Sequence, residues 1–206
     1  MFKYQAETIV GGTSNPSKMP GFSHGTPSDR CNVGHKLKLV PGSVCFECYT
    51  DKGFYTVYKE VIDIALERRY QVIKEVLQDD DKRAEFIIAF QVLTGNIGRG
   101  KLHPHIRIKD SGDLSGYKEL ALWCDIASAC PDTAFWLPTR EYAVVNTYLG
   151  VIPDNLTIRV SAHMIDHGPV QSKFVTSTVH SDKVLHDTEC IAPYQDNNCG
   201  RCRKCW

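Results

Sequence analysis

The stretch HIRIKDSGD at residues 105–113 joins an alternating strand pattern, 105–108, to a turn of polar residues and glycine. A helical pattern follows at 115–129, and strand patterns at 134–137 and 156–160 also end in polar residues. Strands that alternate with helical patterns are typical of parallel β/α units. We therefore expect an α/β fold that forms a partial (β/α) barrel or an open parallel sheet.

The polar residues beyond these strands are the candidate ligand-binding residues of the core. The carboxyl ends of parallel strands meet at one edge of a sheet, and ligands bind there in β/α folds. We predict that a small molecule is bound by Ser111, Gly112, Asp113, Arg140 and Ser161. Two structural explanations stay open, since a Ser-Gly-Asp turn commonly caps a helix and an arginine here could form an internal ion pair. The sequence names no catalytic residue.

The segments on either side extend this prediction. A loose alternation at 3–10 predicts a first strand, and the Gly-, Pro- and Ser-rich stretch 11–48 predicts a long irregular loop. Helical patterns cover 56–77 and 82–94, and a further strand is expected at 173–179. The chain thus contains three well-signalled β/α units and two weaker ones.

The two helical patterns before residue 95 also predict which residues are buried. In the first, we expect one apolar face to lie in the core: Val57, Val61, Ile64, Ala65, Val72, Ile73 and Val76. The run Asp79-Asp80-Asp81 supplies the N-cap of the second. Large aromatic side chains and free cysteines pack as hydrophobic groups, so further core positions are expected at Trp123, Cys124, Cys130, Phe135 and Trp136.

The overall composition is that of a globular protein. The chain has 206 residues, of which 42% are hydrophobic and 23% are charged. Its 24 Lys and Arg residues balance 24 Asp and Glu residues, so no net charge attracts nucleic acid or a membrane surface. No apolar run is long enough to span a bilayer, and the N-terminal segment lacks the apolar core of a secretion signal. We expect neither a membrane nor a nucleic acid as a partner.

Cysteine is the unusual component. The chain has nine cysteines, an odd number that a complete set of disulfides would not use up. In a reducing compartment, clustered cysteines are typical metal ligands. Seven of the nine fall into two groups, one composed of Cys31, Cys45 and Cys48, and the other of Cys190, Cys199, Cys202 and Cys205. We predict that both groups bind metal.

The second cysteine group has the spacing C-x8-C-x2-C-x2-C over residues 190–205. Two successive x2 spacings are typical of the cysteine runs that hold a [4Fe–4S] cluster, whereas structural zinc sites usually use two separated pairs. We predict a fully protein-ligated cluster here, with a four-cysteine zinc site as the alternative. Residues 186–206 would then form a metal-binding tail on a β/α core of residues 1–185.

The first cysteine group, C-x13-C-x2-C over residues 31–48, supplies three ligands. A [4Fe–4S] cluster held by three cysteines keeps one iron open, as S-adenosylmethionine chemistry requires. The order of cysteine loop, strand and Ser-Gly-Asp turn resembles the radical-SAM superfamily, although the usual spacing is C-x3-C-x2-C. That resemblance implies that Asp113 positions the methionine amine. A zinc site with His35 as fourth ligand is the alternative.

A succession of short motifs carries a second, more specific resemblance. In chain order they are SKMP at 17–20, GSVCFECY at 42–49, KGFY at 52–55, DSGDL at 110–114, FWLPTR at 135–140 and CGRCRKCW at 199–206. Over nearly the whole chain they resemble the bacteriophage "gene product 88" family. The resemblance implies a phage origin and expression in the cytoplasm of a bacterial host. It implies no reaction and no catalytic residue.

Three functions fit these features. The first is a radical-SAM-like enzyme with an open-site [4Fe–4S] cluster, an auxiliary [4Fe–4S] cluster and a small-molecule ligand. The second is a non-enzymatic iron–sulfur protein for electron transfer or redox sensing. The third is a zinc-stabilised phage protein that binds a host factor. We expect the first, and the sequence does not indicate the oligomeric state.

Overall fold

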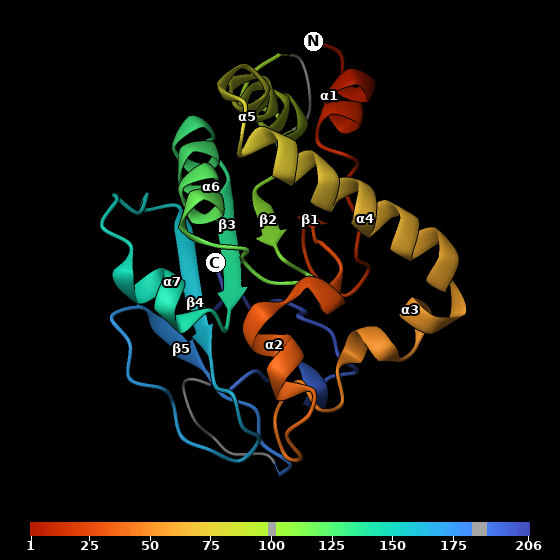
Figure 1. Cartoon of the computed structure of the whole chain (residues 1–206), viewed down its shortest axis with the longest axis vertical. Coiled ribbons are helices and arrows are strands. Elements are labelled where there is room, and N and C mark those ends of the chain that lie inside the picture. Colours follow the sequence, from red (N-terminus) through yellow and green to blue (C-terminus); the bar gives the residue numbers. More distant parts are fainter. Residues whose placement is uncertain (99–101, 183–188) are drawn as a thin grey trace.

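A computed structural model describes residues 1–98, 102–182 and 189–206 of the chain. In these residues five strands form one sheet, in which every neighbouring pair is parallel and the strands follow in chain order. They are β1 (Phe22–His24), β2 (His105–Ile108), β3 (Ala134–Thr139), β4 (Leu156–Ser161) and β5 (Val175–Ser177) (Figure 1). The predicted α/β fold with an open parallel sheet is confirmed.

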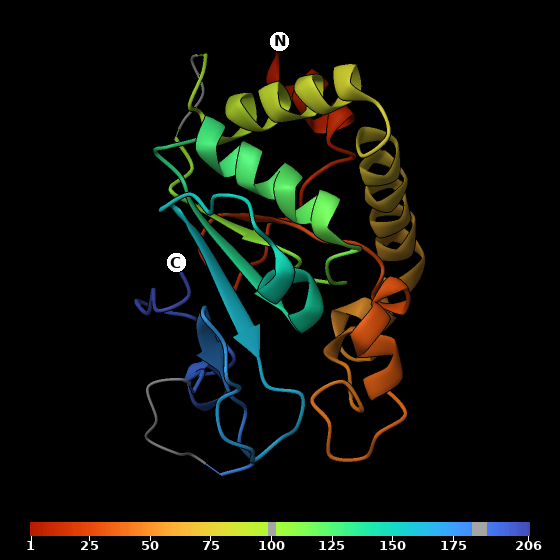
Figure 2. The same cartoon turned by 60° about the vertical axis from the view of Figure 1, so that its left-hand side comes forward.

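The helices lie mainly on one side of this sheet. They are α1 (Lys3–Ile9), α2 (Asn32–Leu37), α3 (Phe54–Val57), α4 (Lys59–Val76), α5 (Asp80–Thr94), α6 (Tyr117–Ala129) and α7 (Tyr142–Thr147). Figure 2 shows α5 (yellow) and α6 (green) on one side of the sheet and the C-terminal segment (dark blue) on the other. Sequential parallel strands with right-handed crossovers place successive helices on the same face. The opposite face is therefore free of helices such as α5 and α6.

The pleat of the strands divides their side chains between these two faces. Ile106, Ile108, Phe135 and Leu137 point into the helix-covered core, where their exposure is 0%. Residues at the alternate positions lie on the other face and are half-buried. Trp136 is one of them, so its predicted place in the core is wrong. The strand pattern gave its position in β3 but not which face the helices would cover.

The N-terminal part of the chain differs from the prediction in two elements. The segment 3–10 is helical rather than extended, because Lys, Gln, Ala and Glu favour a helix and Ala6 and Val10, one turn apart, are buried. The first strand is instead β1, inside the stretch predicted to be an irregular loop. With three residues, all buried, β1 has no alternation that a sequence pattern could reveal. The same stretch also contains α2.

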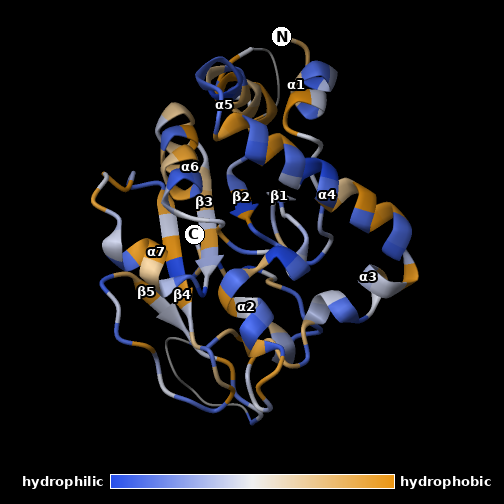
Figure 3. Cartoon of the chain, in the orientation of Figure 1, coloured by the Kyte–Doolittle hydropathy of each residue, from blue (hydrophilic) through white to orange (hydrophobic). Residues whose placement is uncertain are grey.

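The single helix predicted at 56–77 is two helices. The backbone leaves the helical region at Tyr58 (φ −111°, ψ 32°), which separates α3 from α4. Val57, Val61 and Ile64 are 69%, 70% and 63% exposed, so their predicted burial is wrong. The N-terminal half of α4 lies beside α3 and away from the strands, and its surface is partly apolar (Figures 1 and 3). From Leu66 onward the helix has a buried side, formed by Leu66, Arg69, Ile73 and Val76.

Other predictions about the elements are confirmed. The Asp79 carboxylate caps α5 by accepting a hydrogen bond from the backbone N–H of Lys82 at 3.0 Å. Cys124 and Cys130 are buried in the core, as are Trp123 and Phe135.

The predicted boundary between core and tail, at 185/186, lies outside the described residues, so the division into two units stays a prediction. In the described ranges, no helix combines the length and the apolar character that crossing a bilayer requires.

Candidate functional site

The first three cysteines of the chain line one cavity of about 180 Å³. Cys31, Cys45 and Cys48 all lie on the segment that leaves the carboxyl end of β1. The same cavity is lined by Gly112 and Asp113, which follow β2. Because all five strands are parallel, these segments meet at one edge of the sheet. The structure therefore brings the predicted cysteines and the Gly-Asp turn together.

Gly34 makes room beside two of the three sulfurs. A Cβ atom added at this position in α2 would lie 3.0 Å from Cys31 Cβ, 3.5 Å from Cys31 Sγ and 3.7 Å from Cys45 Sγ. The 3.0 Å contact with Cys31 Cβ is tighter than most such contacts, whereas the distances to the two sulfurs are ordinary van der Waals contacts, so a side chain here would crowd Cys31 and fill the space beside both sulfurs. The absence of a side chain at Gly34 thus leaves space on the cavity side of both sulfurs.

Burial favours the neutral form of two thiols in this group, those of Cys31 and Cys45, because it raises the pKa of each. Burial, aided by the nearby charge of Asp113, raises the pKa of Cys31 to about 12. Burial also raises the pKa of Cys45, against the opposing charge of Arg140. Metal binding requires thiolates, so a bound metal would displace protons from these groups.

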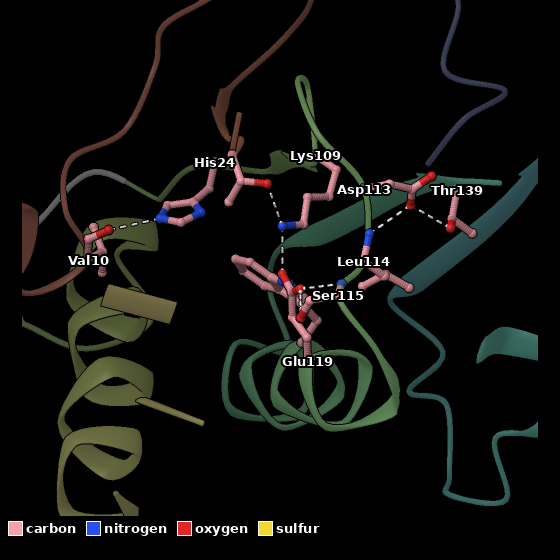
Figure 4. A network of polar contacts seen from close by, with 10 residues as sticks. Val10, His24, Lys109, Asp113, Leu114, Ser115, Glu119 and Thr139 are labelled. Carbon is pink, nitrogen blue, oxygen red and sulfur yellow. Dashed lines mark hydrogen bonds and ion pairs between the residues drawn. The ribbon is translucent and has the colours of Figure 1, made fainter. Parts of the chain in front are cut away.

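The Asp113 carboxylate is held by three hydrogen bonds within the protein. Its Oδ1 accepts from the Leu114 backbone at 2.8 Å and from the Thr139 hydroxyl at 2.6 Å (Figure 4). Its Oδ2 accepts from the Arg140 backbone at 2.9 Å. Burial raises the pKa of Asp113, although these hydrogen bonds oppose the rise. The carboxylate therefore ties the end of β2 to the end of β3 at the wall of the cavity.

Of the other predicted ligand-binding residues, two line this cavity and one lines a neighbouring cavity. Arg140 and Ser161 line the cavity, and the Ser161 hydroxyl is 3.0 Å from that of Ser177 on β5. Ser111 lies instead on a neighbouring cavity, and its buried hydroxyl has no hydrogen-bond partner in the described part of the chain. His35, the alternative fourth ligand, is not among the lining residues.

A buried ion pair supports this edge of the sheet. Lys109 Nζ lies 2.7 Å from Glu119 Oε1, and both side chains are only 1% exposed (Figure 4). The same ammonium group donates to the Thr26 hydroxyl beyond β1 at 2.9 Å. Burial disfavours a charged Glu119, but Lys109 and the Ser115 hydrogen bonds outweigh it, so the pKa of Glu119 is lowered. The pair links the segments that follow β1 and β2 to α6.

Sequence reasoning missed several lining residues, above all Arg107 and Trp136. They are register partners on β2 and β3, and the Arg107 guanidinium lies over the Trp136 ring, 4.5 Å from its centroid. Both lie at the strand positions that alternate with the core positions. The alternation in HIRIK and AFWLP contained this signal, but it did not say which face would stay open.

The four cysteines near the C-terminus line a second, smaller cavity of about 60 Å³. Arg159 and Trp136 also line it, so Trp136 borders both cavities. Burial raises the pKa of Cys205 to about 11, against the opposing charge of Arg159, and burial also raises the pKa of Cys199. Cys190, Cys199, Cys202 and Cys205, which the sequence groups together, thus line one cavity.

The segment that carries these cysteines packs on the helix-free face of the sheet. Trp206 stands edge-on to Trp136 at 5.1 Å between ring centroids, and its indole N–H donates to the Ile106 carbonyl at 3.3 Å. Arg159 donates to the carbonyls of Thr176 and Lys204. These contacts bring the second cysteine group next to the first, although they are far apart in the sequence.

In the described ranges, no group of three or more His, Cys, Asp and Glu side chains is close enough together to hold a single metal ion. All nine cysteines are free of disulfides.

Comparison with known proteins places the chain in a family. The sequence model described as "Gene product 88" matches residues 12–206. The chain belongs to the Gene product 88 family. This confirms the predicted membership of a phage gene product family. The comparisons with curated proteins and with solved structures return no match.

Proposed function

We propose that this Gene product 88 protein binds an iron–sulfur cluster through each of its two cysteine groups. The first cluster would be held by Cys31, Cys45 and Cys48 and would keep one iron open, and the second would be held by all four tail cysteines. The open site would bind S-adenosylmethionine, in a protein that works in the cytoplasm of the bacterial host. One observation carries the proposal: of the residues that the structure describes, three thiols and no fourth thiol or imidazole line the cavity at this edge of the sheet.

The residues of the first cavity fit such a group. Gly34 leaves space beside two sulfurs, and Cys31, Cys45 and Cys48 are all free of disulfides. Free cysteine thiols, once deprotonated, are the usual ligands of iron–sulfur clusters.

The spacing of the tail cysteines supports a cluster over a single zinc ion. Structural zinc sites usually draw their ligands as two separated pairs. The tail instead has two successive x2 spacings, from Cys199 to Cys202 and on to Cys205, which are typical of the runs that hold a [4Fe–4S] cluster.

The chain's own residues would shape the reaction around the open site. When bound and reduced by an external electron donor, the cluster would supply one electron that splits the S–C5′ bond of S-adenosylmethionine into methionine and a 5′-deoxyadenosyl radical. Asp113 would not move to meet the ligand, because its three hydrogen bonds fix it. Its Oδ2 accepts only one of these bonds and retains a lone pair for an amine. The sheet face and the tail would exclude water from the cavity.

The deciding experiment is metal and sulfide analysis of protein purified without oxygen. We expect iron and acid-labile sulfide at about eight each per chain, four for each [4Fe–4S] cluster. Cys48→Ala should lose about half of both and spare the tail cluster. Cys124→Ala is the matched control, because this thiol is buried in α6 away from both cavities, and it should keep the full content.

Addition of S-adenosylmethionine then tests the open site. The reduced wild-type protein should change its electron paramagnetic resonance spectrum and form 5′-deoxyadenosine, and Cys48→Ala should do neither. Stoichiometric zinc without iron would refute both clusters. Iron with no response to S-adenosylmethionine would leave an iron–sulfur protein without this chemistry.

A further inference from the structure

The first cavity contains more positive charge than the protein itself neutralises. Of its cationic lining residues, Lys109 pairs with Glu119, and Lys38 lies 3.0 Å from an Asp51 carboxylate oxygen. Arg107 and Arg140 have no carboxylate within ion-pair distance in the described part of the chain. The single carboxylate on the wall, Asp113, is engaged by hydrogen bonds to Leu114, Thr139 and the Arg140 backbone.

The two guanidinium groups also have unsatisfied donors. The Nε atoms of Arg107 and Arg140 are buried, and neither has a hydrogen-bond partner among the described residues. The contact made by Arg107 Nη1 is with the Met19 sulfur at 3.8 Å, a weak acceptor. Buried polar groups in folded proteins are nearly always paired, so these donors indicate a partner from outside the chain.

Arg107 is positioned to receive such a partner through the edge of its guanidinium. Its face lies over the indole of Trp136, 4.5 Å from the ring centroid, and the two residues are register partners on β2 and β3. Stacking of this kind holds the guanidinium plane and keeps its N–H edge available. An edge of parallel N–H groups matches a carboxylate or a phosphate, which accept two such bonds at once.

We propose that Arg107, together with Arg140, binds the anionic group of the substrate, which is a small carboxylate or phosphate compound. The naming of a substrate rests on the proposed function, whereas the anion site rests on the two arginines alone. Trp136 and Pro138 line the same cavity and would contact the apolar part of that compound.

The test is calorimetric titration of anaerobically purified protein with two probes, malonate for a carboxylate and inorganic phosphate for a phosphate. We expect the wild type to bind one of them at one site per chain, and the preferred probe tells the two chemistries apart. Arg107→Gln and Arg140→Gln should each weaken binding at least tenfold. Arg107→Lys keeps the charge but loses the fork and the stacking, so it should weaken binding by a smaller factor.

Arg83→Gln is the matched control, because Arg83 pairs with Asp125 on the helix side of the molecule, and it should bind like the wild type. Circular dichroism should show that every variant is folded. The proposal is overturned if the wild type binds neither probe, or if Arg107→Gln binds as tightly as the wild type. It is equally overturned if Arg107→Gln only lowers the iron content, since the arginine would then serve the cluster.

The same samples separate this inference from the proposed function. Iron at both sites without anion binding would remove the substrate inference alone. Anion binding that depends on Arg107 in a protein without iron would leave the anion site standing and remove the radical chemistry.

Discussion

Lys109 shows how one residue supports the ligand edge of the sheet. It has a positive φ of 59° directly after β2, is 3% exposed, and its ammonium group joins Glu119 to Thr26. A non-glycine residue in this backbone region is uncommon and is held there by its surroundings. The buried ion pair is therefore part of what fixes the turn at 110–113.

Replacement of Lys109 by Met should destabilise the protein by about 3–5 kcal/mol. The change leaves the Glu119 carboxylate buried without its partner, while the backbone conformation stays equally strained. Urea unfolding measures the difference. Lys59→Met is the control, because Lys59 pairs with Asp63 on the surface of α4, and it should cost less than about 1 kcal/mol. Equal effects of the two substitutions would contradict the role given to the buried pair.

His24 should make the protein less stable in acid. Burial lowers its pKa to about 3, and its Nε2 lies 2.8 Å from the Val10 carbonyl oxygen. The unfolded chain takes up this proton near pH 6.5, whereas the folded chain does not until about pH 3. The free energy of unfolding should therefore fall as the pH drops through this window, by up to about 1.4 kcal/mol per pH unit.

The variant His24→Phe tests this dependence. Between pH 7 and pH 5 it should lose about 2 kcal/mol less stability than the wild type, because the titrating group is gone. His167→Gln removes an exposed histidine and should behave like the wild type. Urea unfolding at the two pH values provides the comparison, and parallel losses in wild type and His24→Phe would speak against a buried neutral imidazole.

Among single residues, the cysteines and the strand-end residues could be predicted from the sequence, whereas Arg107 could not. Ligand spacing is a local property of the sequence, so the amino-acid order alone singles out Cys31, Cys45 and Cys48. Arg107 lines the cavity because helices such as α5 and α6 cover the other face of the sheet, and that depends on the crossovers of the whole sheet. Ser111 was predicted to lie at the same site as Gly112 and Asp113, but it lines a neighbouring cavity. A sequence pattern does not show that one turn divides its residues between two cavities.

Among the elements, α4 contains two halves with different surroundings. Ile73 in the C-terminal half is 2% exposed, whereas Ile64 in the N-terminal half is 63% exposed. The 3.6-residue repeat is continuous across both, so the sequence alone predicted burial for both residues. A repeat reports which residues share a face, but not how far the neighbouring elements extend along it.

Truncation of each isoleucine to alanine should separate the two halves of α4. Ile73→Ala removes buried methyl groups from a packed core and should cost about 2–5 kcal/mol. Ile64→Ala changes an exposed position of the same helix and should stay within about 0.5 kcal/mol of the wild type. Thermal and urea unfolding of both variants check this, and a large cost at Ile64 would mean that its face is covered in solution.

The remaining elements divide by length and pattern. Strands β2, β3 and β4 were predicted within two residues of their bounds, because each alternates and ends in polar residues. The strand β1 and the helix α2 are too short to show a period, and the segment 3–10 has a weak alternation that its helix-forming composition overrides. Tertiary contacts rather than local pattern therefore determine β1 and α2.

In the whole molecule, the sheet has two different covers. One face is covered by helices that alternate with the strands, and the other is covered by the cysteine-bearing segment 189–206. The sequence predicted a metal-binding tail but could not show where it docks, because docking depends on the side chains of Trp136 and Arg159 and on the backbone carbonyl of Ile106, which come from three strands.

Removal of the Trp206 side chain should release this cover. The variant Trp206→Ala loses the ring contact with Trp136 and the hydrogen bond to the Ile106 carbonyl. We expect trypsin to cut at Arg201, Arg203 and Lys204 several-fold faster than in the wild type, because cleavage follows local opening. Leu149→Ala, at a side chain that is 98% exposed, should leave the rate unchanged. Intact-mass spectrometry of timed digests detects the cuts, and an unchanged rate in Trp206→Ala would show that the indole does not hold the segment.

Because the two covers differ in size, we expect the terminal segment to detach from the sheet before the helical layer unfolds. Detachment would expose the Trp136 indole and the Arg107 guanidinium stacked on it, while the helical layer stays folded. Exposed apolar surface on a sheet promotes aggregation. Light scattering from aggregates should then appear before the helical circular dichroism signal falls. An unchanged circular dichroism spectrum therefore does not show that the terminal segment is still in place.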